Sequence, residues 1–120
     1  MFDHVGVNVR DFAVSREFYG RALEPLGIQE TAAFEERKAA AFGREGKYAF
    51  WVAQREPFGT GTHIAFTCAD RATVDAAALA AGGSDNGEPG LREHYNPTYY
   101  GAFVHDPDGN NVEAVCHAPE

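Results

Sequence analysis

Two stretches of the chain, HVGVNVRD at residues 4–11 and HIAFTCAD at residues 63–70, share one pattern. Each begins with a histidine, continues with alternating apolar residues and ends with an aspartate. Alternation with a period of two is typical of a strand, and aspartate is a good N-cap for a following helix. An internal repeat of this kind indicates a repeated structural unit, so each stretch is expected to begin one of two similar modules.

A helix is expected after each aspartate. In the first half, apolar residues recur at helical spacing from Val14 to Leu26, where a proline and a glycine close the segment. In the second half, the same spacing begins at Val74 and stops at Gly82 and Gly83.

Short strand candidates follow each helix. In the first half they lie at 28–34, 37–42 and 47–53. In the second half, an early strand around 86–90 is poorly marked, whereas the runs at 99–105 and 111–116 flank a DPDG turn and indicate a clear hairpin. The order of elements is therefore βαβββ in both halves.

The predicted fold class is α+β, with module one at about 1–53 and module two at about 62–118. The segment at about 54–61 contains one proline and two glycines and is predicted to be the linker. A chain of 120 residues has the commonest size of one domain, so residues 1–120 are expected to form a single domain. The polar and aromatic stretch at 88–97 is the best candidate for a loop over a site.

Composition excludes several classes of function. A net charge of −8 without a basic stripe opposes a phosphate backbone, so nucleic acid is not an expected partner. No apolar run approaches the length that crosses a bilayer, and the N-terminus lacks the features of a secretory signal. We expect no membrane association and a cytoplasmic location. Cys68 and Cys116 lie in strand-like runs and are expected to be buried reduced thiols.

Alternation also predicts where three polar side chains point. In the strands that open the modules, the apolar residues at alternate positions must cover a helix, which leaves His4 and His63 on the opposite face. In the last strand the same argument places Glu113 on the helix-free face. Each residue alone could be an ordinary surface residue. The equivalent places of His4 and His63 in the repeat favour a shared role.

Two imidazoles and one carboxylate suit a first-row divalent ion and leave coordination positions open to a substrate. Glu113 is therefore a candidate metal ligand and a candidate catalytic residue. Aligning Gly46 with Gly109 puts Phe50 at the position of Glu113, so the site is expected to have three protein ligands, with Phe50 lining the pocket.

The motifs together resemble the vicinal oxygen chelate superfamily, which includes glyoxalase I, extradiol dioxygenases and bleomycin-resistance proteins. The resemblance covers almost the whole chain and is carried by DHVGV at 3–7, SxxFY at 15–19, THIAF at 62–66 and FxxDPDGNxVE at 103–113. It implies two modules that form a half-closed mixed-sheet barrel around a cleft. It also implies that His4, His63 and Glu113 hold one divalent metal ion, which can be Zn, Mn, Ni, Fe or Co, and that the chain forms a homodimer.

The resemblance leaves two functions open. The first is a metal-dependent lyase, isomerase or thiol transferase of the glyoxalase-like kind, acting on a small oxygenated substrate. The second is a bleomycin-resistance-like protein that sequesters a small molecule without turnover. Candidate substrate-binding residues are Phe50, Tyr48, Arg92, Tyr99 and Phe103, although Arg92 could equally lie in a solvated loop and the tyrosines in the barrel core. A site within one chain and a site between two chains both remain possible.

Overall fold

A computed structural model describes residues 1–82 and 84–119; the predicted helix stop at Gly83 and the terminal Glu120 lie outside them. Module one contains four strands and one helix plus two short 3-10 turns, and module two follows the same order without those turns. The elements of module one are β1 (Val5–Val9), α1 (Phe12–Leu23), η1 (Glu24–Leu26), β2 (Gln29–Phe34), η2 (Glu35–Arg37), β3 (Ala39–Gly43) and β4 (Phe50–Gln54). Those of module two are β5 (His63–Thr67), α2 (Arg71–Ala81), β6 (Ser84–Leu91), β7 (Tyr100–His105) and β8 (Asn111–Cys116).

The two modules have the same sheet topology. The strand orders are β1-β4-β3-β2 and β5-β8-β7-β6, and in each sheet the first and last strands of the module pair in parallel while the other pairs are antiparallel. The predicted βαβββ order is confirmed in both halves. The predicted helix caps are also present: the side chain of Asp11 accepts a hydrogen bond from the backbone N–H of Val14, and that of Asp70 from Thr73.

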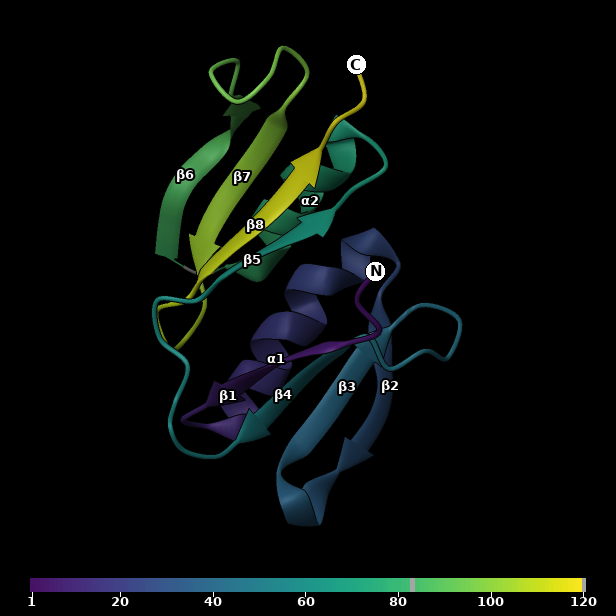
Figure 1. The fold of residues 1–120 in the computed structure, drawn as a ribbon, viewed down its shortest axis with the longest axis vertical. Helices are drawn as coiled ribbons and strands as arrows, with labels where there is room; N and C mark the ends of the chain where they lie inside the picture. The colour runs from purple at the N-terminus through teal and green to yellow at the C-terminus, as the bar shows by residue number, and fades with distance from the viewer. Residues whose placement is uncertain (83, 120) are drawn as a thin grey trace.

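Each helix covers one face of its sheet and leaves the other face open (Figure 1). Alternation along the strands explains this, because one set of side chains enters the core and the other does not. The core joins both modules: the rings of Phe50 and Phe66 lie 5.3 Å apart, and α1 packs against α2. The two sheets are separate among the described residues and do not close into a barrel, and their open faces point to the same side (Figure 1).

A buried polar cluster connects the modules behind the sheets. The hydroxyl of Tyr19 on α1 donates to the carboxylate of Asp106 at 2.6 Å, and Asp106 also accepts from the backbone and side chain of Asn110. Asn110 in turn accepts from the backbone of Thr62 and donates to the carbonyl of Gly59 in the linker. Burial raises the pKa of Tyr19 well above its usual value, so its hydroxyl remains a donor.

The second module departs from the sequence prediction at one strand. Strand β6 runs from Ser84 to Leu91, so the irregular loop begins at Arg92 and not at residue 88. The strand shifts register between Asp85 and Gly87 and again between Gly87 and Gly90. Such bulges interrupt the period-two pattern, which is why the sequence marks this strand poorly.

Cys68 and Cys116 are buried and form no disulfide, as expected, and burial raises the pKa of the Cys68 thiol to about 11. None of the described helices is both long enough and apolar enough to span a bilayer.

Candidate functional site

The open face of module two carries a buried carboxylate. The side chain of Glu113 on β8 points away from the helices and is only 2% exposed. The hydroxyl of Tyr99 donates to its Oε2 atom, and the Nε2 atom of His63 lies 3.2 Å from its Oε1 atom. Gly101 makes room for this carboxylate, since a Cβ atom there would lie 3.1 Å from Oε2. Tyr99 and His63 therefore hold the two oxygens of Glu113 in defined positions.

The hydrogen bonds of His63 set its tautomer. Its Nδ1 atom lies 3.1 Å from the carbonyl oxygen of Asn111, which can only accept, so Nδ1 carries a proton. In the neutral ring the Nε2 lone pair then faces a carboxylate oxygen, and two acceptors this close repel each other unless a proton or a cation lies between them. Two metal ligands on adjacent coordination positions, each about 2.1 Å from the ion, are about 3.0 Å apart in octahedral geometry and about 3.4 Å apart in tetrahedral geometry. The separation of 3.2 Å thus fits a protonated His63 paired with Glu113, and it equally fits two ligands of one metal ion.

Aromatic rings support the pair from one side. The ring of Phe103 stacks on His63 at 6.2 Å, and the guanidinium of Arg92 lies 5.4 Å from the Phe103 ring. Arg92 also donates to the carbonyl of Glu88. Burial, followed by the hydrogen bond to Glu113, raises the pKa of Tyr99 to about 12. Tyr99 and Phe103 thus lie beside the His63–Glu113 pair, and Arg92 lies beside Phe103.

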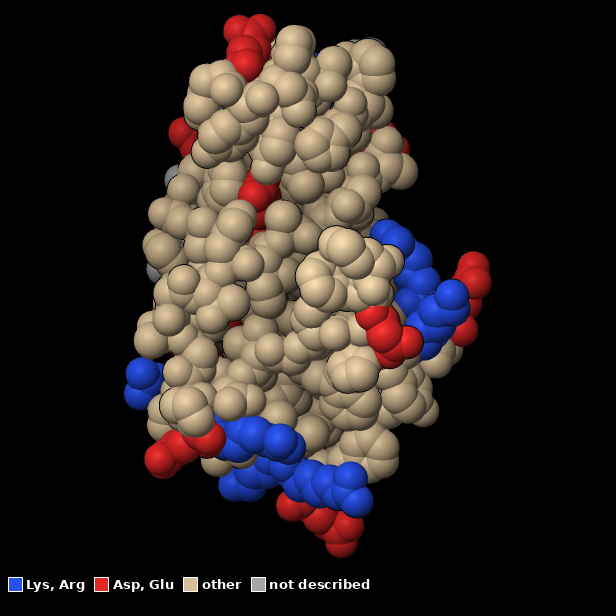
Figure 2. All heavy atoms as spheres, viewed as in Figure 1, with Lys and Arg blue, Asp and Glu red and all other residues tan. Residues whose placement is uncertain are grey.

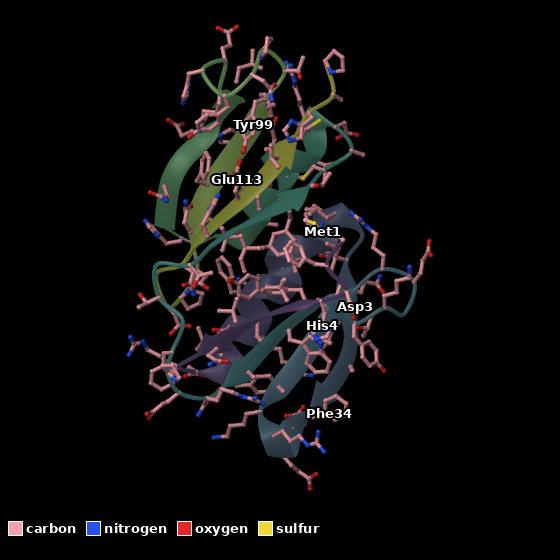
Figure 3. The ribbon with its side chains drawn as sticks, viewed as in Figure 1. Met1, Asp3, His4, Phe34, Tyr99 and Glu113 are labelled. Carbon is pink, nitrogen blue, oxygen red and sulfur yellow. The ribbon has the colours of Figure 1, made fainter. Side chains whose placement is uncertain are left out.

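His4 lies on module one, in a different environment. Its Nδ1 atom donates to the carboxylate of Asp3 at 2.7 Å, so its Nε2 atom is free to accept, and the side chain is 59% exposed. Figure 3 places His4 on the lower sheet and Glu113 on the upper one, with both on the open side. No group of three histidine, cysteine, aspartate or glutamate side chains within the described residues could hold a metal ion. One copy of the chain brings His63 and Glu113 together but does not add His4.

The prediction that Phe50 lines the pocket beside these ligands is wrong by one residue. In the parallel pairs, Val5 aligns with Phe50 and Gly6 with Trp51, whereas Ala65 aligns with Glu113. Because Gly6 and Ala65 occupy equivalent places in the repeat, Trp51 is the counterpart of Glu113. Phe50 faces the helices and is 3% exposed, with its ring 4.9 Å from that of Tyr19. It touches a groove between the modules and not the open face of module one.

The open face of module one forms a cleft of about 680 Å³ around Trp51. Its lining includes His4, which the sequence predicted as a metal ligand, and Tyr48, which it predicted as a substrate-binding residue. Phe34, Arg37 and Arg55 also line the cleft and were not among the predicted site residues. Figure 2 shows positive side chains near the lower end of this face. The alternation in β4 already places Trp51 and Phe50 on opposite faces, so a correct alignment of the two hairpins would have identified Trp51 from the sequence.

The chain belongs to the Glyoxalase/Bleomycin resistance protein/Dioxygenase superfamily, whose family model matches residues 1–114. It is similar to the crystal structure of a glyoxalase/bleomycin resistance protein from Albidiferax ferrireducens T118, with 31% identity, a TM-score of 0.83, and coverage of 97% of this chain and 98% of that one. No curated protein matches the chain by sequence.

Two more distant structures share the fold. A glyoxalase/dioxygenase from Nostoc punctiforme is 21% identical, with a TM-score of 0.69 and coverage of 98% of this chain and 91% of that one. Glyoxalase I from Zea mays is 22% identical, with a TM-score of 0.69 and coverage of 98% of this chain and 44% of that one. These matches agree with the two-module architecture.

Proposed function

We propose that this protein is a divalent-metal-dependent enzyme of the glyoxalase-like kind, acting on a small oxygenated substrate by lyase, isomerase or thiol-transferase chemistry. The observation that carries the proposal is the approach of His63 Nε2 to 3.2 Å from Glu113 Oε1 while Nδ1 is committed to a carbonyl. A divalent cation between the two atoms would remove the repulsion and would neutralise the buried carboxylate while His63 stays neutral.

The third ligand is His4 of a second copy of the chain. His4 and His63 share the feature that fixes a metal-binding histidine, because in both rings Nδ1 donates to an oxygen and Nε2 is left to bind. His4 lies on module one and Glu113 on module two, with both open faces on the same side, so a two-fold homodimer can set module one of each copy against module two of the other (Figure 3). Exposed aromatic side chains on these faces, among them Phe34, Tyr48 and Tyr95, favour such burial.

The residues around this site define what it can do. A metal held by His63, Glu113 and the second copy's His4 would supply a Lewis acid for a substrate oxygen, and Zn, Mn, Ni, Fe and Co all accept these ligands. Tyr99 donates to Oε2 of Glu113 and so leaves Oε1 directed toward His63. Glu113 is the candidate catalytic base of this site, and its carboxylate is only 2% exposed, so it is largely shielded from water.

Complementation between two inactive variants tests the shared site. His4→Ala and Glu113→Gln are each expected to lower metal affinity by more than about 100-fold. When the purified variants are unfolded together and refolded at equal amounts, half of the dimers are mixed and each has one intact site. Metal content, measured by elemental analysis, should therefore return to about a quarter of the wild-type value.

The controls separate the two possible arrangements. Refolding each variant alone is the matched control and should not restore metal content. If the mixture also binds no metal while wild-type protein refolded in the same way does, the ligands do not come from two chains. If Glu113→Gln alone keeps the wild-type metal content, Glu113 is not a ligand. Turnover is then sought with dicarbonyl–thiol adducts, epoxides with thiols, and catechols.

A second function, small-molecule sequestration of the bleomycin-resistance kind, is favoured by the aromatic cleft of about 680 Å³ on module one. The two functions differ in their dependence on metal. A sequestering protein would bind its ligand equally well after metal removal and would show no turnover in the substrate screen.

A further inference from the structure

We propose that the cleft of module one is a binding site for an organic anion, in which Arg37 and Arg55 hold a carboxylate and Trp51 packs against a planar apolar body. This deepens the proposed function by naming the substrate class, and it rests on that function only in assuming that the bound anion is the substrate.

One part of the cleft lining is aromatic and apolar. The Trp51 ring is stacked with Phe34, with centroids 6.1 Å apart and an interplanar angle of 13°, and meets Tyr48 edge-on at 5.8 Å. Gly6, Val7, Ala39 and Ala53 also line the cleft and add no polar side chain. A volume of about 680 Å³ is within the range of small-molecule sites. Aromatic rings beside these small and aliphatic side chains suit a flat or aromatic ligand body.

The charge of the cleft is opposite to that of the chain. The protein has a net charge of −8, yet the charged residues that line the cleft are two arginines and one aspartate, and the aspartate is hydrogen-bonded to His4. A cleft with an excess of positive charge on an acidic protein attracts anions selectively.

The two arginines also differ from others on the surface. Arg10, Arg16 and Arg21 each pair with a carboxylate, whereas neither Arg37 nor Arg55 has an ion-pair or hydrogen-bond partner in the part of the chain that the structure describes. Arg37 instead lies 5.6 Å from the ring of Phe34 on the wall of the cleft. A guanidinium binds a carboxylate through two parallel hydrogen bonds, so free guanidinium groups beside an aromatic wall suit an aryl or alkenyl carboxylate.

Fluorescence provides a direct test, because Trp51 is the single tryptophan of the chain. Metal-free protein, treated with chelator, is titrated with 3-phenylpropanoate, with the neutral 3-phenylpropanamide and with the cation phenethylammonium. The carboxylate should change the Trp51 emission saturably, and the amide and the cation should bind at least about tenfold more weakly. Calorimetry on the same protein checks that the optical change reports binding.

Variants locate the site. Arg37→Gln and Arg55→Gln should each weaken binding of 3-phenylpropanoate about tenfold or more, and together they should remove it. Arg21→Gln is the matched control, since Arg21 pairs with Glu17 on α1, and it should bind as wild type does. Circular dichroism confirms that every variant is folded.

Equal binding of carboxylate and amide, unchanged binding by both arginine variants, or no saturable binding by any of the three probes would overturn the proposal. Because the titration uses metal-free protein, its failure leaves the shared metal site standing. Failure of the complementation experiment would in turn leave the anion site standing.

Discussion

The two modules share a topology but have different open faces. In module two, the strand position equivalent to Gly6–Trp51 is occupied by Ala65–Glu113, and a buried carboxylate meets a histidine. In module one the same position holds Trp51, whose ring forms the wall of a cleft. The histidines that open the modules are retained in both. The two modules therefore share the histidine position but differ at the position of Trp51 and Glu113.

This difference indicates a division of tasks. Module two has the carboxylate and the histidine that the proposed metal site requires, and module one has the volume, the rings and the guanidinium groups that the proposed anion site requires. Within one copy these faces lie beside each other and not opposite each other (Figure 3). Neither face forms a complete site by itself, which is consistent with the proposed dimer.

The largest expected effects on stability and metal affinity come from replacing either Phe50 or Trp51 of β4 by glutamate. Phe50→Glu places a charge in the core and should lower the free energy of unfolding by about 3 kcal/mol or more. Trp51→Glu should change it by no more than about 1 kcal/mol, because the side chain points to the open cleft. It should tighten the metal on the order of tenfold by adding a carboxylate near His4, and abolish binding of 3-phenylpropanoate.

Urea denaturation and metal competition measure both variants. If Phe50→Glu is stable and tightens the metal while Trp51→Glu unfolds the protein, the register equivalence of Trp51 and Glu113 is incorrect. That result would also remove the contrast between the two open faces.

A substitution in the buried polar cluster that connects the modules is expected to have an intermediate effect on the free energy of unfolding. Tyr19→Phe removes the donor to the buried Asp106, and the free energy of unfolding should fall by about 1–3 kcal/mol. Tyr100→Phe, which removes a hydrogen bond to Asp75 at the surface, is the control and should cost less than about 1 kcal/mol. Equal losses in urea denaturation would show that the Tyr19 cluster is no stronger a connection than a surface contact.

The smallest of these expected effects concerns metal affinity and comes from the tyrosine beside Glu113. Tyr99→Phe should lower metal affinity about tenfold because it frees one oxygen of the carboxylate, whereas Tyr48→Phe in module one should leave it unchanged. Metal competition on the two variants measures the difference. A loss of affinity in Tyr48→Phe as large as that in Tyr99→Phe would contradict the separate roles of the faces.

The pH dependence of Tyr99 adds a second measurement. Its pKa is raised from 10.0 to about 12, so the folded state favours the protonated phenol. The stability linked to this group is fully present below pH 10.0 and is lost as the pH rises from 10.0 to about 12. Ultraviolet titration of phenolate in metal-free protein should lose a late step in Tyr99→Phe and retain it in Tyr48→Phe.

The sequence determined the two modules and the faces of their strands. The repeat of histidine, alternating apolar residues and aspartate predicted β1, β5 and the caps of both helices, because these depend on local hydrogen bonds and on period-two alternation. The same alternation placed His63 and Glu113 on one open face, where the structure brings them together.

The register of the hairpin formed by β3 and β4 could be determined only from the structure. Six residues, 44–49, connect β3 to β4, but only five, 106–110, connect β7 to β8. A shift of one residue exchanges the two faces of a strand, so aligning the turns by their glycines assigned Phe50 to the face that Trp51 occupies. Strand β6 was obscured in a similar way, because its bulges break the alternation.

The relative position of the modules also came only from the tertiary structure. Both a facing and a side-by-side arrangement satisfy the same alternation, since either one buries the helix-covered faces. The packing of α1 on α2, the contact between Phe50 and Phe66, and the Tyr19–Asp106 hydrogen bond select the side-by-side arrangement. These contacts join residues far apart in the chain, and no local pattern specifies them. They separate His4 from Glu113 within one copy, which the sequence alone left undecided.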